Sequence, residues 1–354
     1  MRNFNLLLLT LALLIIGGCS TKQPSTAQQE EKPDADAFVS QVKIAMILPE
    51  KRIGRYAEST STALFAYLIS RDHPFILKTY TVQEVSKKVL EETLEQIEAD
   101  GFHYVIAPLT LEGAKNIAQI EAELFIYLPT IHMSDLQTDN PNIYCGAIDY
   151  TQQIDALMPK VKAPLVIMYG TSTRGKKLMQ LTKERYKQMH KEDSQKSAVL
   201  TYGIDRKRSN LRSYFENNQK IASGTLFLNT PIIKSTMVLS QLSVYDVNIT
   251  NVLSTQVTYN PLLLSMTQKR NREALYIANS ITIQDDDVIQ ANSVLGNDIN
   301  YDWINYATTV GADYIYHLIS GKECHYDLPM QDNQVHYPVH IMQAVNTHFE
   351  TAQK

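Results

Sequence analysis

The stretch Val42–Ile69, which reads VKIAMILPEKRIGRYAESTSTALFAYLI, predicts the fold. Its first seven residues, Val42–Leu48, form a nearly unbroken apolar run, which is typical of a strand buried on both faces of a parallel sheet. Pro49 ends this run, and we expect the polar segment Glu50–Tyr56 to be a loop. A helix follows at Ala57–Ile69, because one face of it carries Leu64, Phe65, Leu68 and Ile69. The order strand, loop, helix is the first half of a βαβ unit.

This order is repeated along the chain. The predicted strands are Phe75–Tyr80, Tyr104–Ala107, Phe125–Leu128, Ile143–Ala147, Leu165–Tyr169, Ala198–Tyr202, Thr225–Leu228 and Asn251–Ser254. The predicted helices are Gln83–Asp100, Leu111–Leu124, Thr151–Val161, Arg174–Met189, Asn210–Asn217 and Ile232–Leu242. The repetition restarts after Asp149 and Tyr150. It therefore predicts the α/β fold class, with two doubly wound lobes that face a central cleft.

The predicted lobes divide the chain into an N-terminal lobe at 42–148 and a C-terminal lobe at 149–258. Residues 259–354 are expected to be crossing segments that return to the lobes, followed by a C-terminal tail. Within this part, Leu275–Ala278 reads as a strand that could return to the first lobe, and Trp303–Ile319 as a helix. Asp327–Tyr337 reads as a hairpin or an extended tail, and the acidic run Asp285–Asp287 as a solvated loop.

The N-terminus resembles the signal of a bacterial lipoprotein. Arg2 precedes the apolar run Leu6–Ile16, which has the length of a signal-peptide core and is too short to span a membrane. The sequence Ile16-Gly17-Gly18-Cys19 resembles a lipobox, which implies that residues 1–18 are removed and that the Cys19 thiol is acylated. A multiply acylated cysteine is a firm membrane anchor. Ser20 favours the outer membrane, by resemblance to lipoprotein sorting in enteric bacteria.

A polar segment separates this signal from the first strand. Residues 20–36 contain no large apolar side chain and cannot bury a core, so residues 19–41 are expected to be a flexible tether. The alternative for the N-terminus as a whole is an ordinary cleaved signal peptide with an incidental cysteine.

Composition excludes several classes of function. The net charge is −4, with 33 Lys and Arg against 37 Asp and Glu, so nothing in the charge balance favours nucleic acid as a partner. Glycine is scarce, at 13 of 354 residues, and the sequence contains neither a G-x-G-x-x-G nor a Walker-type phosphate loop. The nucleophile elbow G-x-S-x-G and the zinc motif H-E-x-x-H are also absent. We therefore expect a non-enzymatic protein without a cofactor.

The histidines and cysteines near the C-terminus do not have the spacing of a metal site. His325, His336, His340 and His348 follow one another at intervals of 11, 4 and 8 residues, and a proline lies inside the one helical interval. Scattered surface histidines are the preferred interpretation, with no metal bound. After Cys19, only Cys145 and Cys324 remain; an oxidising compartment would permit a disulfide between them, and two separate thiols with Cys145 buried are the alternative.

The chain resembles the type I periplasmic-binding-protein fold over about residues 42–349. The resemblance rests on Lys43–Pro49, on Tyr104–Thr110, where Ala107-Pro108 stands in place of a family Gly-Pro, and on Leu128–Ser134, which carries a Pro-x-apolar pattern. Two branches of that family fit. One contains amino-acid receptors of ABC importers, and the other contains lipoprotein activators of penicillin-binding proteins.

The resemblance implies a membrane-anchored periplasmic lipoprotein that binds a small polar ligand or an envelope protein through its two-lobed body. One alternative is the solute receptor of an ABC importer for amino acids; another is a regulator of a peptidoglycan synthase. The importer branch clasps an amino acid with small hydroxyls and glycines after its strands, whereas the first loop here is charged and bulky.

Candidate binding residues are those that follow predicted strands, where the loops of an α/β sheet face the cleft. In the first lobe they are Arg52, Arg55, Tyr56, Thr110 and Ser134. In the second lobe they are Thr171, Arg174, Tyr202 and Asp205. Arginine offers a planar fork for a carboxylate or phosphate. The alternatives are solvated loop charges for the arginines, and helix capping for Thr110, Ser134 and Thr171.

Overall fold

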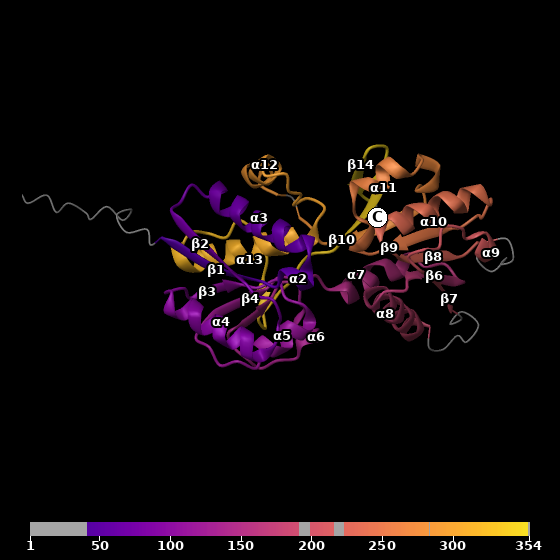
Figure 1. Ribbon diagram of the computed structural model, residues 1–354. Helices are drawn as coiled ribbons and strands as arrows, with labels where there is room; N and C mark the ends of the chain where they lie inside the picture. Colours follow the sequence, from indigo (N-terminus) through magenta and orange to yellow (C-terminus); the bar gives the residue numbers. More distant parts are fainter. Residues whose placement is uncertain (1–40, 191–198, 216–222, 283, 353–354) are drawn as a thin grey trace, which may run out of the picture. The chain divides into compact units, whose positions relative to one another are not determined.

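The computed structural model describes residues 41–352, apart from 191–198, 216–222 and 283 (Figure 1). The expected signal peptide, the acylated Cys19 and nearly all of the tether therefore lie outside the described residues. No described helix is both long and apolar enough to span a lipid bilayer.

Two sheets form the framework of the described chain, which confirms the expected two-lobed α/β class (Figure 1). The first sheet has the order β11-β12-β5-β4-β3-β1-β2. Its strands are β1 (Val42–Leu48), β2 (Phe75–Thr81), β3 (Tyr104–Ile106), β4 (Phe125–Leu128), β5 (Ile143–Cys145), β11 (Met330–Gln331) and β12 (Gln334–Val335). The second sheet has the order β14-β13-β10-β9-β8-β6-β7. Its strands are β6 (Leu165–Gly170), β7 (Val199–Ile204), β8 (Thr225–Asn229), β9 (Asn251–Ser254), β10 (Leu275–Asn279), β13 (His340–Val345) and β14 (His348–Thr351).

Helices cover both faces of each sheet. Those of the first lobe are α2 (Glu50–Ile53), α3 (Arg55–Ser70), α4 (Lys87–Ala99), α5 (Leu111–Ile117), α6 (Met133–Leu136), α12 (Asp286–Val294) and α13 (Trp303–Ser320). Those of the second lobe are α7 (Tyr150–Leu157), α8 (Thr173–Met189), α9 (Arg212–Phe215), α10 (Ile232–Val244) and α11 (Pro261–Met266), with short 3₁₀ turns η1 (Met158–Lys160), η2 (Gln256–Thr258) and η3 (Lys269–Asn271).

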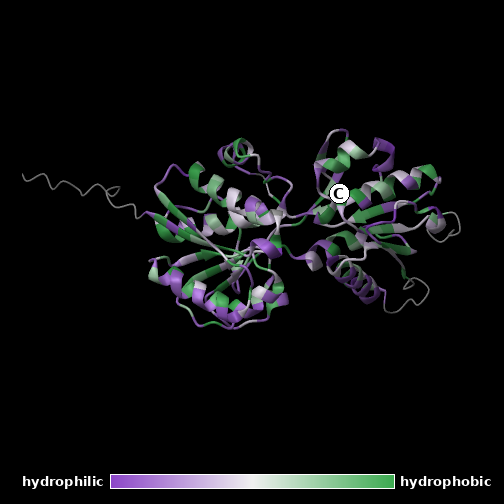
Figure 2. Ribbon diagram, in the orientation of Figure 1, coloured by the Kyte–Doolittle hydropathy of each residue, from purple (hydrophilic) through white to green (hydrophobic). Residues whose placement is uncertain are grey.

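The buried strand β1 explains why the first sheet is covered on both sides. Successive side chains of a strand point to opposite faces. Ile44 and Met46 pack into the core under α3 and α13, while Ala45 and Ile47 pack into the core under α4 and α5. The second lobe repeats this division, with α10 and α11 on one face and α7 and α8 on the other. Figure 2 shows the central strands coloured as hydrophobic and α8 carrying a hydrophilic outer face.

The chain passes between the sheets three times, after β5, after β10 and after β12. The expectation that Leu275–Ala278 could return to the first lobe is wrong, because β10 pairs with β9 and β13 inside the second sheet. The segment Asp327–Tyr337 does form a hairpin, since β11 pairs antiparallel with β12 and extends the first sheet beside β5.

Several local expectations are corrected by capping and turns. Glu50–Tyr56 is not a loop, because α2 occupies its first half; Gly54, with a φ of 54°, then separates α2 from α3. α5 ends at Ile117, since Asn140 binds the Ala118 and Ile120 carbonyl groups and holds the next segment out of the helix. Asp285 is not in a solvated loop but caps α12.

Both described cysteines are free thiols, so the alternative of a disulfide between them is not realised. Cys145 lies fully buried in β5, and burial raises the pKa of its thiol to about 12. Cys324 is half-buried, and burial raises its pKa to about 11.

Candidate functional site

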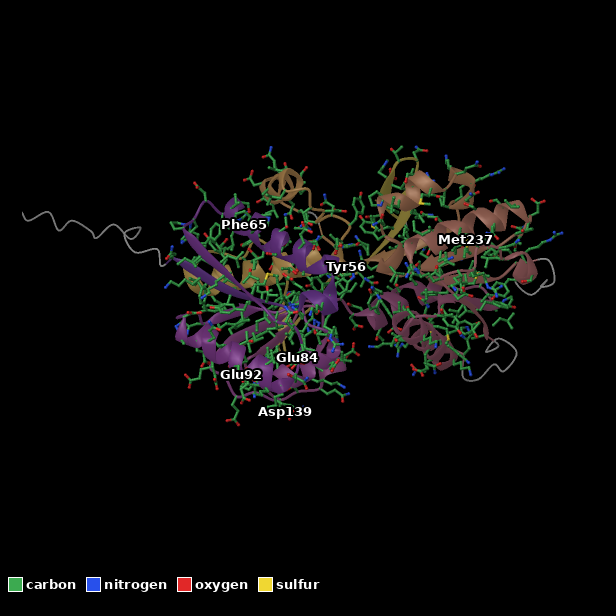
Figure 3. The ribbon with its side chains drawn as sticks, viewed as in Figure 1. Tyr56, Phe65, Glu84, Glu92, Asp139 and Met237 are labelled. Carbon is green, nitrogen blue, oxygen red and sulfur yellow. The ribbon has the colours of Figure 1, made fainter. Side chains whose placement is uncertain are left out.

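A cavity of about 260 Å³ lies at the carboxyl ends of β6, β8 and β9, the edge at which α/β sheets bind ligands. The loops after these strands supply its wall from the second lobe. Tyr56 from α3 and Trp303 from the start of α13 complete it from the first lobe. Figure 3 labels Tyr56 at the end of the first lobe that meets this cavity.

Arg174 is the cation of this cavity. Ser172 caps α8 by accepting a hydrogen bond from the Gly175 backbone N–H, which fixes the first turn that carries Arg174. The guanidinium donates to the Tyr150 hydroxyl and lies 5.2 Å from the centre of the Tyr150 ring and 5.9 Å from that of Trp303. The cation is thus held between two aromatic faces.

The Tyr150 side chain beside Arg174 is mostly removed from water. Burial raises the pKa of Tyr150, and the positive charge of Arg174 partly offsets this rise. Tyr150 is therefore a neutral hydroxyl near pH 7, and it can accept a hydrogen bond from the arginine.

Two further tyrosines form the opposite wall. Tyr259 and Tyr301 lie with ring centres 5.1 Å apart, and Phe349 of β14 packs 4.7 Å from Tyr259. Tyr259 belongs to the second lobe and Tyr301 to the segment before α13, so this aromatic group links the two lobes. Burial raises the pKa of Tyr259 to about 12.

The floor of the cavity is polar. Asn229 ends β8 and is 2% exposed; its amide group donates to the Thr182 hydroxyl at 3.0 Å. Among the described residues no group donates to Asn229 Oδ1, although this oxygen is buried. An unpaired buried carbonyl costs about 1–3 kcal/mol, so a ligand N–H that reached it would be bound favourably.

Next to this floor, a buried network fixes the segments that cross between lobes. Gln153 Nε2 donates to Ser280 Oγ at 2.8 Å, and Gln153 Oε1 accepts from the Gln256 backbone N–H at 2.9 Å. Gln256 Nε2 donates to Asn279 Oδ1 at 2.8 Å, while Gln256 Oε1 accepts from the Ser280 backbone N–H at 2.6 Å. The start of α7 and the end of β10 are thereby tied to the loop that lines the cavity.

Of the nine predicted site residues, Tyr56 and Arg174 line the cavity. Thr110 and Ser134 lie elsewhere in the first lobe: Thr110 caps α5, and the Ser134 hydroxyl contacts His132 Nδ1 at 2.8 Å. Arg52 is exposed in α2 and does not line the cavity. Arg55 begins α3, and its side chain is outside the described part of the structure.

The remaining three predicted residues belong to the second lobe but stay outside the cavity. Thr171 is exposed between β6 and α8. Tyr202 lies within the edge strand β7 and contacts Tyr214, with ring centres 5.0 Å apart. Asp205 accepts from the Lys207 and Arg208 backbone N–H groups, which lower its pKa, and it caps a turn.

Sequence reasoning missed most of the cavity. Asn229 ends β8 and Gln256 follows β9, so the strand-end rule that selected Arg174 could have found them. Tyr259 lies in the same loop after β9. Tyr301 and Trp303 carry no such signal, because they reach the cavity from a later segment whose return to this edge depends on the crossings.

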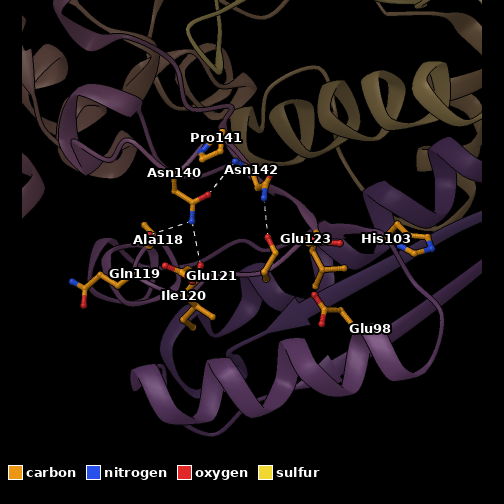
Figure 4. A pocket seen from close by; sticks show the side chains of 12 residues that line it. Glu98, His103, Ala118, Gln119, Ile120, Glu121, Glu123, Asn140, Pro141 and Asn142 are labelled. Atoms are coloured by element: carbon orange, nitrogen blue, oxygen red, sulfur yellow. Dashed lines mark hydrogen bonds between the residues drawn. The ribbon is translucent and has the colours of Figure 1, made fainter.

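A second hollow lies elsewhere and is a weaker candidate. It has about 870 Å³ and lies at the amino-terminal ends of β3, β4 and β5, away from the ligand-binding edge (Figure 4). Glu98, Glu121 and Glu123 line it. The Asn142 side chain, which also lines it, donates to the Ala122 carbonyl and thus stabilises the loop before β4. No group of three potential metal ligands occurs among the described residues.

Comparison with known proteins identifies the fold. The leucine-binding protein LivK from Thermotoga maritima superposes with a TM-score of 0.58 at 10% identity, covering 88% of this chain and 98% of that one. The binding protein LivJ from Streptococcus pneumoniae, solved with isoleucine, gives 0.57 at 8% identity, with coverage of 88% and 98%. LpoA from Haemophilus influenzae gives 0.57 at 10% identity, and 90% of this chain covers 60% of that protein.

These similarities establish the type I periplasmic-binding-protein fold, and both branches expected from the sequence occur among the similar structures. Searches with protein-family models and among curated proteins each found no match.

Proposed function

We propose that this chain is a non-enzymatic lipoprotein, anchored in the outer membrane through Cys19, whose two-lobed body binds a small polar ligand between its lobes. The observation that supports this most directly is the cavity beside Arg174, with its fixed cation, aromatic walls and polar floor. The similar structures include proteins named for, or solved with, leucine and isoleucine.

The cavity favours a small carboxylate that also carries an N–H donor and an apolar part. Arg174 supplies donors for a carboxylate, and the unpaired Asn229 Oδ1 suits an N–H group. The rings of Tyr56, Tyr259 and Trp303 provide contact area for the apolar part. A volume of about 260 Å³ limits the ligand to roughly amino-acid size.

Trp303 makes this proposal testable without a label, because it is the only tryptophan of the chain. Amino acids, small aromatic acids and muropeptides are titrated while its fluorescence is followed, and isothermal calorimetry confirms each positive result. Arg174→Ala should weaken binding by about ten- to a hundredfold, since charged hydrogen bonds contribute about 1.5–3 kcal/mol. Arg52→Ala, outside the cavity, is the matched control. Failure of every compound at millimolar concentration would refute ligand binding here.

The anchor is tested separately. Radiolabelled palmitate should be incorporated into the wild-type chain and not into Cys19→Ser, which should leave the membrane fraction. Labelling of the Cys19→Ser variant would contradict acylation at this residue.

A second candidate function is regulation of a peptidoglycan synthase by protein contact. The observation that favours it is an exposed apolar groove on the second lobe, away from the cavity. Purified chain added to a purified penicillin-binding protein should raise its glycan polymerisation or cross-linking rate; an unchanged rate with no measurable complex would exclude this function for that synthase.

A further inference from the structure

Helix α10 has two apolar faces, and the outer one is only partly covered. Its inner face packs Val238, Leu239 and Leu242 into the core of the second lobe. The outer face carries Ile233 and Val244, at positions i and i+11 of one stripe; Met237, at i+4, is half-buried and also packs against this core. Ile233 is 51% exposed and Val244 is 70% exposed. A surface helix of a soluble protein normally has a polar outer face, so this stripe calls for an explanation.

Part of this stripe lines a hollow. The hollow lies between α10 and α11 and has about 340 Å³; Ile233, Met237 and Met266 are its apolar lining residues, and Ser209, Lys234, Thr236 and Ser240 are its polar ones. Met266 and Leu262 of α11 are 47% and 44% exposed. Figure 3 labels Met237 in this part of the second lobe. From Ile233 to Val244 the stripe runs about 16 Å, which matches three turns of a docked helix.

Two segments that carry basic residues are attached to α10 beside this groove. The loop with Arg206, Lys207 and Arg208 is fixed to α10, because Lys234 Nζ donates to the Arg208 carbonyl and Gln241 Nε2 donates to that of Ser209. The second segment, η3, carries Lys269 and Arg270, and Ser243 of α10 donates to Asn271 at 2.6 Å.

This positive charge is a local property. Residues 205–212 and 231–273 together contain eight Lys and Arg, of which Arg272 is buried, against three Asp and Glu, although the whole chain has a net charge of −4. Residues 81–140 of the first lobe have the opposite balance, with three Lys and Arg against eleven Asp and Glu. Figure 3 labels three of these acidic residues, Glu84, Glu92 and Asp139.

We propose that the α10–α11 groove binds an acidic amphipathic helix of a partner protein, whose apolar side chains enter the groove beside these two basic segments. A hollow that accepts an inserted side chain favours a peptide over a flat lipid surface. The groove is separate from the cavity beside Arg174, so this proposal does not depend on the ligand. It deepens the second candidate function by stating which chemistry on the partner is recognised.

The test uses a fluorescent 18-residue peptide with Leu at i, i+4, i+7 and i+11 and Glu on its other faces. Its anisotropy is titrated with the purified full chain, and two comparison peptides carry Lys in place of Glu or Ser in place of Leu. We expect binding of the Glu/Leu peptide only, with an affinity that falls between 50 and 300 mM salt, because the surface charges are screened.

Two pairs of variants locate the contact. Ile233→Glu and Met266→Glu should each weaken binding at least tenfold, about 1.4 kcal/mol, while Val294→Glu, at an 81% exposed position of α12, should not. The double variant Lys269→Glu/Arg270→Glu should weaken binding at least tenfold and reduce its salt dependence. The double variant Lys176→Glu/Lys187→Glu on α8 is the matched control.

The proposal would be overturned by equal binding of the Lys peptide, by groove variants that bind like wild type, or by tighter binding to anionic phosphatidylglycerol vesicles that compete with the peptide. Self-association abolished by Ile233→Glu would instead assign the groove to a second copy of the chain and also refute it. If the chain binds the Glu/Leu peptide but does not change the rate of a peptidoglycan synthase, the second candidate function is refuted, while the α10–α11 groove remains a binding site for an acidic helix.

Discussion

Replacing Gly311 by alanine should destabilise the protein, although helix propensity alone predicts the opposite. Gly311 lies in the interior of α13, where alanine is favoured over glycine by about 1 kcal/mol. A Cβ atom at this position would meet Tyr127 Cε1 at 2.1 Å and Cδ1 at 2.3 Å. Carbon atoms pack at about 3.5–4.0 Å, so the ring or the helix would have to move by more than an ångström.

The surroundings of Tyr127 leave it no room to move. The side chain is fully buried, and its hydroxyl donates to the Ala307 carbonyl at 2.9 Å. On the far side, a Cβ added at Gly146 would lie 1.9 Å from the same hydroxyl. Overpacking costs about 1–3 kcal/mol and more where backbone is displaced, so we expect a net loss of at least about 2 kcal/mol in the free energy of unfolding.

Urea unfolding followed by Trp303 fluorescence measures this loss, because Trp303 begins the same helix. The control is the background Tyr127→Leu, which is itself destabilised but leaves space beside Gly311. There Gly311→Ala should be neutral or stabilising by up to about 1 kcal/mol, which gives a coupling energy of about 2 kcal/mol or more. An equal cost in both backgrounds, or a gain in the wild-type background, would refute the steric argument.

Three further predictions concern charge, thiols and the crossing segments. The Asp287 backbone N–H lowers the pKa of Asp285, so the ionised carboxylate contributes stability that is present above about pH 4 and is lost as the pH falls through the lowered pKa. The difference in the free energy of unfolding between wild type and Asp285→Asn should therefore shrink between pH 5 and 2. A difference that stays constant over this range would contradict the prediction. At pH 8 a thiol reagent should react slowly with Cys324, and it should react with Cys145 only after the protein unfolds, because burial raises the pKa of both thiols. Immediate reaction of both thiols in the native protein would refute their burial. Gln256→Leu should cost about 1–3 kcal/mol in the free energy of unfolding by heat or urea, because it leaves the buried Ser280 backbone N–H unpaired. A neutral result would show that the network is dispensable.

The strands were predictable to within one or two residues where they are short apolar runs, as at β4 and β9. Helix ends were less predictable, because a distant side chain can decide them. α5 is the example: its apolar pattern continues to Leu124, yet Asn140 binds the carbonyls after Ile117 and the helix stops. The error at β10 has the same origin, since an apolar strand carries no mark of the sheet that it joins.

In the candidate site, the sequence identified Arg174 and Tyr56, because both follow a strand in the first βα step of their lobe. It also proposed Thr110 and Asp205 by the same rule, and these cap nearby backbone instead. A polar residue after a strand can satisfy either the next helix or a ligand. Only the positions of neighbouring N–H groups distinguish the two.

The sequence by itself determined the α/β class and the repetition into two lobes, because these depend on the local periodicity of apolar side chains. The sequence also predicted that later segments cross between the lobes. The tertiary structure alone decided that these later crossings follow β10 and β12, and they bring Tyr301 and Trp303 to the strand ends of the second lobe. It also decided that Ile233 and Val244 on the outer face of α10 stay exposed. The physical reason is that contacts between residues far apart in sequence depend on how whole elements pack, and the local pattern of each element does not encode its partner.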